Sequence, residues 1–537
     1  MKTLEKVIAK IENTPTSFLF WVTSFLGLIA VRLLIENWLG GFQNRSGLFL
    51  FYEFAHTLLF FLIVYFLFLG ILEKFLKIGI KKISNVLLWG YLIILAPPII
   101  DNIISGGTGF WSFYDFGSAR DLIGNFFTFF DSTPEIGITY GVRVEVALAV
   151  IFLLIYGYLK SKNILKSLTL AVISYTAFFV LATAPSWITI LAKGFFKGFL
   201  AVGIVDTAQM FLTPAKIFSH EIVDIISSLN IKMSLIYSLV ITGIILIGLF
   251  FNYKEKFILF LKNSRPPQLI YHGGLLIIGV GLGSILNNEV LEINFFNIVS
   301  FLVLLIAVVC AWLSSVVVND LQDKKIDAKT NIDRPLIKEI FSVGEYKTLG
   351  WTLFLISILF SSIVSFKVAL LFIAYQAIAW LYSSWPLRLK RIAFVSTFTS
   401  AMASLMILFS GYILISPLQN IKSFPFDIIA LLVIGYTLSL PVKDFRDVEG
   451  DRENGVYTIP VVFGNEWGKI IVGSGIFISF ILSVVFLNEF KLFWWSILFG
   501  GIAFWTVIKH KNPRTLPWWI LGLVFIYGLI LVKIILL

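Results

Sequence analysis

Long apolar runs separated by short polar segments follow one another along almost the whole chain. Most runs are close to the roughly 20 residues that a helix needs to cross a bilayer. The pattern predicts about six membrane-spanning helices in the first half of the chain and about nine in the second. The predicted spans are 17–35, 48–72, 83–100, 142–159, 165–192, 233–251, 268–286, 296–318, 348–364, 368–385, 394–415, 426–441, 470–486, 492–508 and 518–536.

The composition supports an all-α, multi-pass membrane protein. Hydrophobic residues make up 58% of the chain and charged residues only 14%, although 537 residues would otherwise suggest several soluble domains. The single cysteine, Cys310, lies inside an apolar run, which excludes an intrachain disulfide. The 4 histidines are widely scattered, so a histidine metal site is not expected.

Positive charge predicts the topology. The net charge of +11 comes from Lys and Arg in connections between spans, a pattern that orients membrane proteins and does not indicate a nucleic-acid partner. If the basic connections face the cytoplasm, every span crosses once and the alternation closes without conflict. These connections are 74–82, 160–166, 254–265, 320–347, 388–391, 443–452 and 509–514.

A polar, basic linker at 252–267 divides the two halves and ends in a Pro pair that disfavours helix continuation. The boundary is therefore expected near Arg265. This predicts a transmembrane domain of unknown role at 1–265 and a second domain at 266–537, with the oligomeric state left open.

The clearest candidate chemistry follows the eighth predicted span. Asp320, Asp323 and Asp327 are spaced i, i+3 and i+7, so one continuous helix would place all three carboxylates on one face. Like charges grouped at a membrane boundary are costly unless a cation lies between them. Mg²⁺ prefers oxygen ligands and is usually shared between carboxylates and substrate phosphates.

The same spacing recurs after the predicted span 426–441, in Asp444, Asp447 and Asp451. One such triplet could be a solvated helix end. Two triplets with identical spacing, on the same predicted side, favour a shared metal–diphosphate site.

Cations and an aromatic residue lie near these acidic segments. Arg334 precedes a proline, and its guanidinium suits phosphate oxygens, although taken alone it is more simply explained as a topology signal. Tyr382, Arg388 and Lys390 follow another span on the same side, where an interfacial aromatic belt with positive-inside charge is the simpler interpretation. Together, acidic helix ends, cations and apolar helices describe a cavity able to ionise an allylic diphosphate.

Three motifs resemble the signatures of the UbiA superfamily of intramembrane prenyltransferases. They are Asn-Asp-x-x-Asp-x-x-x-Asp from Asn319, Tyr-Ser-x-x-Pro-Leu-Arg-Leu-Lys-Arg from Tyr382, and Lys-Asp-x-x-Asp-x-x-Gly-Asp from Lys443. The resemblance covers about 266–537, and it implies a nine-helix transmembrane bundle preceded by an additional domain of about six transmembrane helices. Leu-Ile-Lys-Glu at 336–339 departs from the Pro-Ser-Gly-like turn of many relatives, which weakens assignment to a subfamily.

The resemblance also implies roles for individual residues. Two Mg²⁺ ions would be held by Asn319, Asp320, Asp323 and Asp327 on one side and by Asp444, Asp447 and Asp451 on the other. The diphosphate would be bound by Arg334, Arg388, Lys390 and Lys443, while Tyr382 would lie near the reacting carbon. The catalytic set would be Asp320, Asp323, Asp444, Asp447 and Tyr382.

The expected function is therefore Mg²⁺-dependent transfer of a prenyl group within a cell membrane, in isoprenoid lipid synthesis, with the active site on the cytoplasmic side. The donor would be a polyprenyl diphosphate. The acceptor would be an aromatic quinone precursor, a tetrapyrrole or a glycerol-phosphate ether lipid. The alternative is a polyprenyl-lipid transporter or flippase with cation-coupling carboxylates, although such carboxylates usually lie near mid-membrane and not at span ends.

The first half contains two long connections on the predicted outer side, 101–145 and 194–230, which mix acidic and apolar residues. They could form an outward lipid-handling site. The simpler interpretation is an ordered external cap with paired charges.

Overall fold

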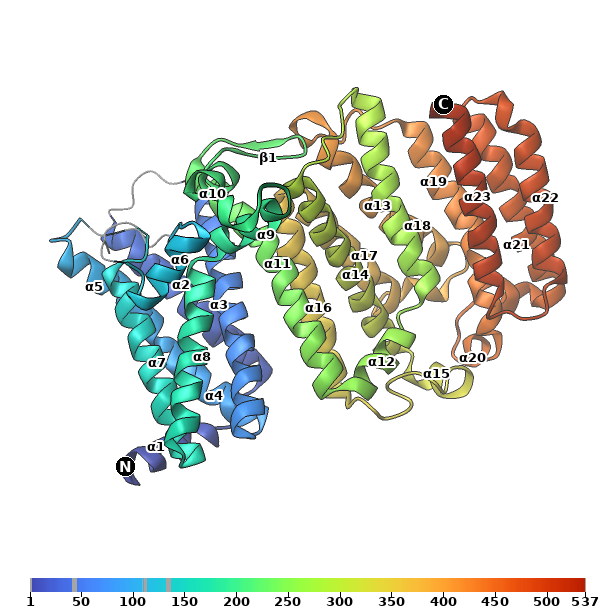
Figure 1. Ribbon diagram of the computed structural model, residues 1–537. Helices are drawn as coiled ribbons and strands as arrows, with labels where there is room; N and C mark the ends of the chain where they lie inside the picture. The colour runs from blue at the N-terminus through green and yellow to red at the C-terminus, as the bar shows by residue number, and fades with distance from the viewer. Residues whose placement is uncertain (1, 41–45, 109, 111–113, 132–136, 537) are drawn as a thin grey trace. The chain divides into compact units, whose positions relative to one another are not determined.

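The computed structural model describes residues 2–40, 46–108, 110, 114–131 and 137–536. The described residues are almost entirely helical, apart from one two-stranded hairpin (Figure 1). They form two compact units: an N-terminal unit, comprising the chain up to Lys216 together with Glu221–Asn252, and a C-terminal unit, comprising Ile217–His220 and Tyr253–Leu537. Fifteen of the described helices are long and apolar enough to cross a membrane, six in the first unit and nine in the second, which confirms the predicted count.

The N-terminal unit is an α-helical bundle. Its elements are α1 (Lys2–Glu12), α2 (Phe18–Leu39), α3 (Gly47–Leu76), α4 (Ile80–Gly90), η1 (Tyr91–Leu95), α5 (Ala96–Ile104), α6 (Ala119–Phe127), α7 (Tyr140–Ser161), α8 (Ile164–Ala182), α9 (Ala184–Lys197), η2 (Phe199–Ala201), α10 (Ile204–Phe211) and α11 (Ile225–Asn252), with β1 (Ala215–Ile217) and β2 (His220–Ile222) forming the hairpin.

Local sequence signals explain where several of these helices begin. Ser17, Ser46 and Thr139 accept hydrogen bonds from backbone N–H groups of the first turns of α2, α3 and α7. The apolar run predicted as one span at 165–192 is divided at Thr183 into α8 and α9. Pro185 lies in the first turn of α9, where a proline is compatible with helix geometry because no intrahelical N–H bond is lost.

Polar residues in the long connections of this unit are paired. Asp101 accepts a hydrogen bond from the Gly141 backbone at 2.7 Å, and Arg143 donates to the backbone oxygen of Asp131 at 2.6 Å. Asp206 pairs with Lys197 at 2.6 Å. These contacts agree with an ordered cap whose charges are paired. Part of the first connection, including Glu135, lies outside the described residues.

The C-terminal unit contains the nine remaining spans. Its elements are α12 (Lys254–Lys262), α13 (Pro266–Asn287), α14 (Phe295–Gln322), α15 (Lys324–Thr330), α16 (Val343–Val364), α17 (Phe366–Ser383), η3 (Leu389–Arg391), α18 (Val395–Ile415), η4 (Pro417–Gln419), α19 (Phe426–Ser439), η5 (Leu440–Arg446), α20 (Val448–Glu453), α21 (Ile459–Phe486), η6 (Phe490–Leu492), α22 (Phe493–Lys509) and α23 (Leu516–Leu536).

Helices α13 and α18 pack closely because glycines face one another. A Cβ on Gly279 would lie 2.2 Å from the backbone oxygen of Leu408, and one on Gly411 would lie 2.2 Å from that of Leu276. Small residues that let helix backbones approach are typical of membrane interiors. Helix α18 is accordingly the most enclosed of the described spans. Of the residues in its apolar stretch 78% are buried inside the protein, whereas in α23 only 11% are buried.

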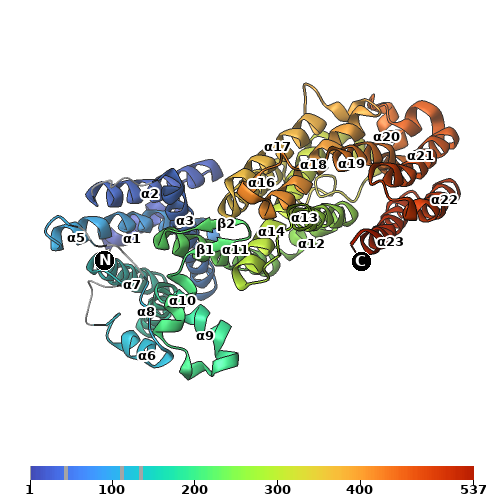
Figure 2. The same cartoon turned by 90° about the horizontal axis from the view of Figure 1, so that it is seen from above.

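The outward helix faces are apolar, as expected for contact with lipid. Exposed side chains on α21–α23 include Val485, Trp505, Phe525 and Leu529. These three helices lie together at one side of the C-terminal unit in both views (Figures 1 and 2). The short helices α12, α15 and α20 lie at one end of the same unit (Figure 1). The chain is an integral membrane protein, and the acidic segments lie at this end of its C-terminal bundle.

Candidate metal and diphosphate site

Both acidic segments are broken at their middle aspartate, which corrects the expectation of one continuous helix. Asp323 lies between α14 and α15, and Asp447 lies between η5 and α20. The two residues have similar backbone angles, φ −97° and ψ 9° for Asp323 and φ −115° and ψ 17° for Asp447. In both segments a short helix follows the middle aspartate, but the preceding element is the α-helix α14 in the first and the 3₁₀ helix η5 in the second.

Asp320 is the most enclosed of the aspartates, with 1% of its surface exposed. Its carboxylate accepts hydrogen bonds from Asn263 at 2.6 Å, from Tyr346 at 2.9 Å and from Arg265 at 2.9 Å. Arg334 lies further away, at 3.8 Å. These groups come from α16, from the connection between α12 and α13, and from the connection between α15 and α16, so Asp320 joins several segments of the bundle.

Asp323 forms ion pairs with two of the predicted phosphate-binding cations. Arg388 donates to one carboxylate oxygen at 3.0 Å and Lys390 to the other. Asn319, one helical turn earlier, lies 3.4 Å from the Lys390 ammonium. Burial lowers the pKa of Lys390, and the Asp323 carboxylate opposes that shift. Arg388 and Lys390 thus lie directly beside the first acidic segment, as the sequence predicts.

Asn331 connects the two acidic segments. Its side-chain amide donates to Asp327 at 2.9 Å and to Asp447 at 3.0 Å. Its carbonyl oxygen accepts from Arg446. A second bridge, the ion pair between Lys329 and Glu453, joins α15 to α20. Residues separated by more than 100 positions are therefore held in one cluster, as a shared site requires.

Fewer carboxylates of the second acidic segment have hydrogen-bond or ion-pair partners than those of the first. The carboxylates of Asp444 and Asp451 make no hydrogen bond or ion pair with any residue that the structure describes. Burial raises the pKa of Asp451 to about 8, and the negative charges of Asp444 and Asp447 add to the rise. Lys443 donates instead to the Tyr382 hydroxyl at 3.1 Å, and its ammonium lies over the Tyr382 ring.

The donor chemistry of these residues fits Mg²⁺. Asp327 leaves one buried carboxylate oxygen without a hydrogen-bond partner, and burial raises the pKa of this carboxyl to about 6. Among the described residues, no three acidic, His or Cys side chains converge on one point. Mg²⁺ does not require such a group, because it usually takes one or two carboxylates and completes its shell with water and substrate phosphate.

Several residues of the site were not predicted from the sequence. Asn263, Arg265, Asn331, Tyr346 and Arg446 all contact the acidic segments or their partners. Only Asn331 and Arg446 carried a signal, because they lie inside the quoted motifs or directly after them. The segment 336–339, whose sequence differs from that of many relatives, is held in place by Leu336. This side chain is buried against Tyr346 and neighbouring apolar side chains.

Comparison with known proteins places these motifs in a family. The model of the UbiA prenyltransferase family matches residues 269–531. A digeranylgeranylglyceryl phosphate synthase from Methanospirillum hungatei is 32% identical over 200 residues, which cover 35% of this chain and 68% of that protein. Chlorophyll synthase from Arabidopsis thaliana is 29% identical over 170 residues, 29% of this chain and 42% of that protein.

The chain spans about half the length of the curated relatives that match first, 42% for the Arabidopsis protein and 58% for a digeranylgeranylglyceryl phosphate synthase from Sulfolobus acidocaldarius. Among solved structures, a UbiA homologue from Archaeoglobus fulgidus described as bound to DMAPP and Mg²⁺ is 20% identical. It covers 51% of this chain and 99% of that one, with a TM-score of 0.39. On the sequence match to residues 269–531 and to the Methanospirillum relative, the chain belongs to the UbiA prenyltransferase family.

Proposed function

We propose that this chain is a Mg²⁺-dependent enzyme that transfers a prenyl group from a polyprenyl diphosphate to a lipophilic acceptor inside the membrane. The observation that carries the proposal is the cluster in which Asn331 joins Asp327 to Asp447, with Arg388 and Lys390 beside it. Two acidic segments and several cations in one place can bind both a divalent ion and a diphosphate.

Metal binding is assigned to the two acidic segments. Asn319, Asp320, Asp323 and Asp327 would hold one Mg²⁺ and Asp444, Asp447 and Asp451 the other. When bound, Mg²⁺ would neutralise the charge that develops on the departing diphosphate.

Diphosphate binding is assigned to Arg334, Arg388, Lys390 and Lys443. Arg388 and Lys390 are ion-paired with Asp323, which holds both cations beside the carboxylates that would bind the metal. The same two groups would donate to phosphate oxygens of the substrate, because poorly solvated charges need partners of opposite sign.

The reaction itself needs no protein nucleophile. The bond between the allylic carbon and the diphosphate oxygen breaks, the acceptor forms a new bond to that carbon, and the acceptor loses a proton. Tyr382, whose hydroxyl and ring contact Lys443, would lie beside the reacting carbon. Apolar helices around the site would keep water from the developing carbocation.

The test uses full-length protein in nanodiscs with Mg²⁺ and labelled geranylgeranyl diphosphate. The acceptor panel contains an aromatic quinone precursor, a tetrapyrrole and a glycerol-phosphate ether lipid. We expect one acceptor to be prenylated with matching diphosphate release, and we expect EDTA, Asp320→Ala and Asp444→Ala to abolish both. Equal diphosphate release by the wild type and both variants would overturn the assignment. Lipid movement between leaflets without diphosphate release would favour the transporter alternative.

We also propose that the acidic segments face the cytoplasm, because the basic connections lie at the same ends of the spans. Lys325 is exposed on α15 and gives a reporter position. In a Cys310→Ala background, Lys325→Cys should react with an impermeant thiol reagent in inside-out vesicles and not in right-side-out vesicles. The reverse pattern would place the site on the outer side.

A further inference from the structure

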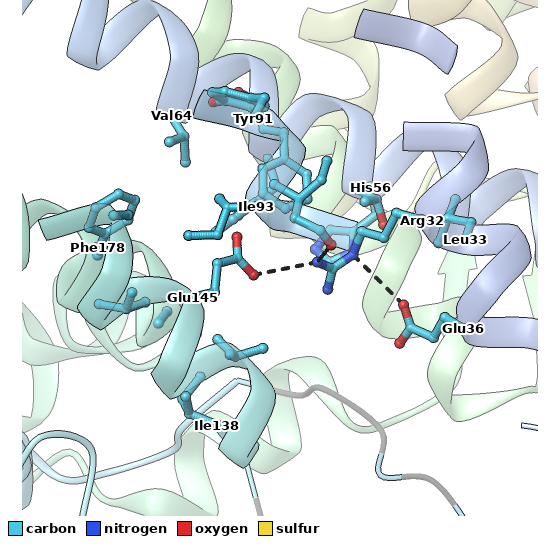
Figure 3. Close-up of a pocket in the computed structure, with 18 of the residues that line it drawn as sticks. Arg32, Leu33, Glu36, His56, Val64, Tyr91, Ile93, Ile138, Glu145 and Phe178 are labelled. Carbon is cyan, nitrogen blue, oxygen red and sulfur yellow. Dashed lines mark hydrogen bonds and ion pairs between the residues drawn. The ribbon is translucent and has the colours of Figure 1, made fainter. Parts of the chain in front are cut away.

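The N-terminal unit encloses a cavity that is independent of the candidate metal site. Its volume is about 450 Å³, within the range of small-molecule and cofactor sites. Residues from α2, α3, α4, the η1 turn, α7, α8 and α11 line it, and all of them belong to the N-terminal unit. Most of the lining is aliphatic or aromatic, including Val64, Tyr91, Ile93 and Phe178 (Figure 3).

A charged group lies at one end of this cavity. Arg32 of α2 donates to the backbone oxygen of Ile94 at 2.9 Å. It also pairs with Glu145 of α7 at 3.5 Å and with Glu36 at 3.8 Å. Figure 3 shows the two carboxylates reaching toward the guanidinium from opposite sides. The three side chains are nearly enclosed, with 8% of Arg32, 19% of Glu36 and 14% of Glu145 exposed.

Two carboxylates share one guanidinium in this group, so its formal charge is negative. The contacts of 3.5 and 3.8 Å are longer than strong charge-assisted hydrogen bonds, which leaves acceptor capacity on both glutamates. A phosphate head would meet like charge at close range, which would weaken its binding. A head group that donates hydrogen bonds and carries no negative charge would instead satisfy the carboxylates.

Other polar groups of the wall have partners within the protein. Glu53, a third carboxylate of the lining, accepts a hydrogen bond from Asn37 at 3.1 Å. The His56 ring nitrogen lies 2.6 Å from the Tyr114 hydroxyl, which in turn lies 2.7 Å from the Tyr237 hydroxyl. This series of hydrogen bonds holds the cavity wall in place on the side of α3 and α11. The acceptor capacity directed at a ligand is therefore provided by Glu36 and Glu145.

The cavity is polar at one end and apolar at the other. Along α3 its lining extends from Glu53 to Phe68, about 22 Å at the usual rise per residue. Along α7 it extends in the same sense from Val142 to Leu153, and α2 contributes Arg32 and Glu36 from its C-terminal half. The apolar end thus reaches well into the span, as a hydrocarbon chain would require.

We propose that this cavity binds a neutral, hydroxyl-headed lipid of the diacylglycerol or long-chain alcohol class. The hydrocarbon chain lies along α3 and α7 between Val64 and Phe178, and the head hydroxyl donates to Glu145 or Glu36. The carboxylate-bearing end disfavours polyprenyl diphosphates, so the site is distinct in chemistry from the metal and diphosphate site of the C-terminal unit. The proposal does not depend on the proposed prenyl transfer.

The test uses the full chain in nanodiscs with two photoreactive probes that carry the same acyl chains, dioleoylglycerol and dioleoylphosphatidate. Crosslinked peptides are mapped by mass spectrometry, which separates labelling of α3 and α7 from labelling of the C-terminal unit. We expect saturable labelling of α3 and α7 by the diacylglycerol probe, at least about tenfold stronger than by the phosphatidate probe. Equal labelling by the two probes, or no saturable labelling of these helices, would overturn the proposal.

A matched pair of variants tests the cavity itself. Ala149→Trp places an indole in the lining, whereas Ile151→Trp places one on the outward, 51% exposed face of the same helix. Ala149→Trp should reduce diacylglycerol labelling about tenfold and Ile151→Trp should leave it unchanged. If Ala149→Trp fails to fold, Leu153→Phe narrows the same space with a smaller change. Unchanged labelling in a folded cavity-filling variant would contradict the proposal.

A second pair of variants tests the head-group selectivity. The double variant Glu36→Gln/Glu145→Gln leaves Arg32 as the only charge of the group and should shift the preference toward phosphatidate. Glu73→Gln removes a carboxylate at the other end of α3, where it pairs with Asn252 at 2.9 Å, and should preserve the wild-type preference. Retention of the diacylglycerol preference by the double variant would show that the carboxylates do not select the head.

Discussion

The side-chain amide of Asn331 donates a hydrogen bond to the carboxylate of Asp447 at 3.0 Å, although the two residues are 116 positions apart. Asn331 lies in the loop after the first acidic segment, and Asp447 marks the break in the second. The same amide group reaches Asp327 at 2.9 Å. One neutral side chain thus holds two like-charged carboxylates together without adding a charge of its own.

Replacing Asn331 should impair catalysis more than stability. In Asn331→Ala the carboxylates of Asp327 and Asp447 lose their shared donor, and partners of this kind typically change metal affinity or activity about 10- to 100-fold. We expect the Mg²⁺ concentration for half-maximal prenyl transfer to rise by that factor. Asn287→Ala at the far end of α13, whose side chain bonds only its own helix, is the control and should behave as the wild type.

Lys390 should affect donor affinity. Lys390→Met removes an ammonium that pairs with Asp323 and that we assign to the diphosphate, while Arg388 remains to neutralise the carboxylate. The KM for the prenyl diphosphate should rise about tenfold or more, since a charge-assisted phosphate contact is lost. Lys324→Met removes an exposed lysine from the same acidic segment and should leave KM unchanged. An unchanged KM in Lys390→Met would remove this residue from the binding set.

Asp320 should be important for folding as well as for metal binding. Asp320→Ala leaves the guanidinium of Arg265, whose side chain is 25% exposed, without its ion-pair partner. Breaking a fully buried pair costs about 3 to 5 kcal/mol, so we expect a loss of no more than about 3 kcal/mol here. The buried Cys310 is the only cysteine and gives a direct measurement, because a thiol-reactive dye labels it only on unfolding. The midpoint of thermal labelling should fall. Asp333→Ala, which removes a 76% exposed side chain, should change it little.

The contact between α13 and α18 should not tolerate a single added methyl group. In Gly279→Ala the new Cβ would lie 2.2 Å from the Leu408 oxygen, so the helices must separate. Overpacking of this kind costs about 1 to 3 kcal/mol. Gly281→Ala, on the same helix with open space around it, should keep or slightly raise the unfolding midpoint. Equal midpoints for the two variants would show that the backbones are not in contact.

Asp206 should give the N-terminal unit an acid-sensitive contact. The Lys197 ammonium and the Gly203 backbone N–H lower the pKa of Asp206 to about 2, from an ordinary value of about 3.9. The stabilisation is therefore complete above about pH 4 and is lost as the pH falls toward 2. The melting temperature of the wild type should exceed that of Asp206→Asn at pH 6, and the difference should shrink through this window. A constant difference would contradict the assignment.

The span count could be predicted from the sequence because the bilayer imposes one length and one polarity on every crossing. Interruptions inside a span were harder to predict. The division of 165–192 at Thr183 and the breaks at Asp323 and Asp447 are set by local backbone geometry within otherwise regular patterns. Hydropathy averages over such positions, so the expectation of one continuous helix through each i, i+3, i+7 triplet was wrong, while the metal-binding role of the residues stays a prediction.

The partners of the acidic residues could not be predicted, because they depend on contacts between distant segments. Arg265 was interpreted as part of a linker, yet it donates to Asp320. Tyr346 begins a span and carries no motif, but its hydroxyl reaches the same carboxylate. The cavity of the N-terminal unit had only a partial sequence signal. Glu145 ends the connection 101–145, for which an outward lipid-handling site is one interpretation, whereas Arg32 and Glu36 lie on α2, far earlier in the chain.

The origin of the Asp320 donors limits how the protein can be shortened. Asn263 and Arg265 precede residue 269, where the family match begins, and they lie just after α12. A fragment cut at the family boundary would retain every aspartate of the proposed metal site but lose two of the groups that hydrogen-bond Asp320. A fragment made to test the proposed prenyl transfer should therefore start before Tyr253, so that α12 is kept.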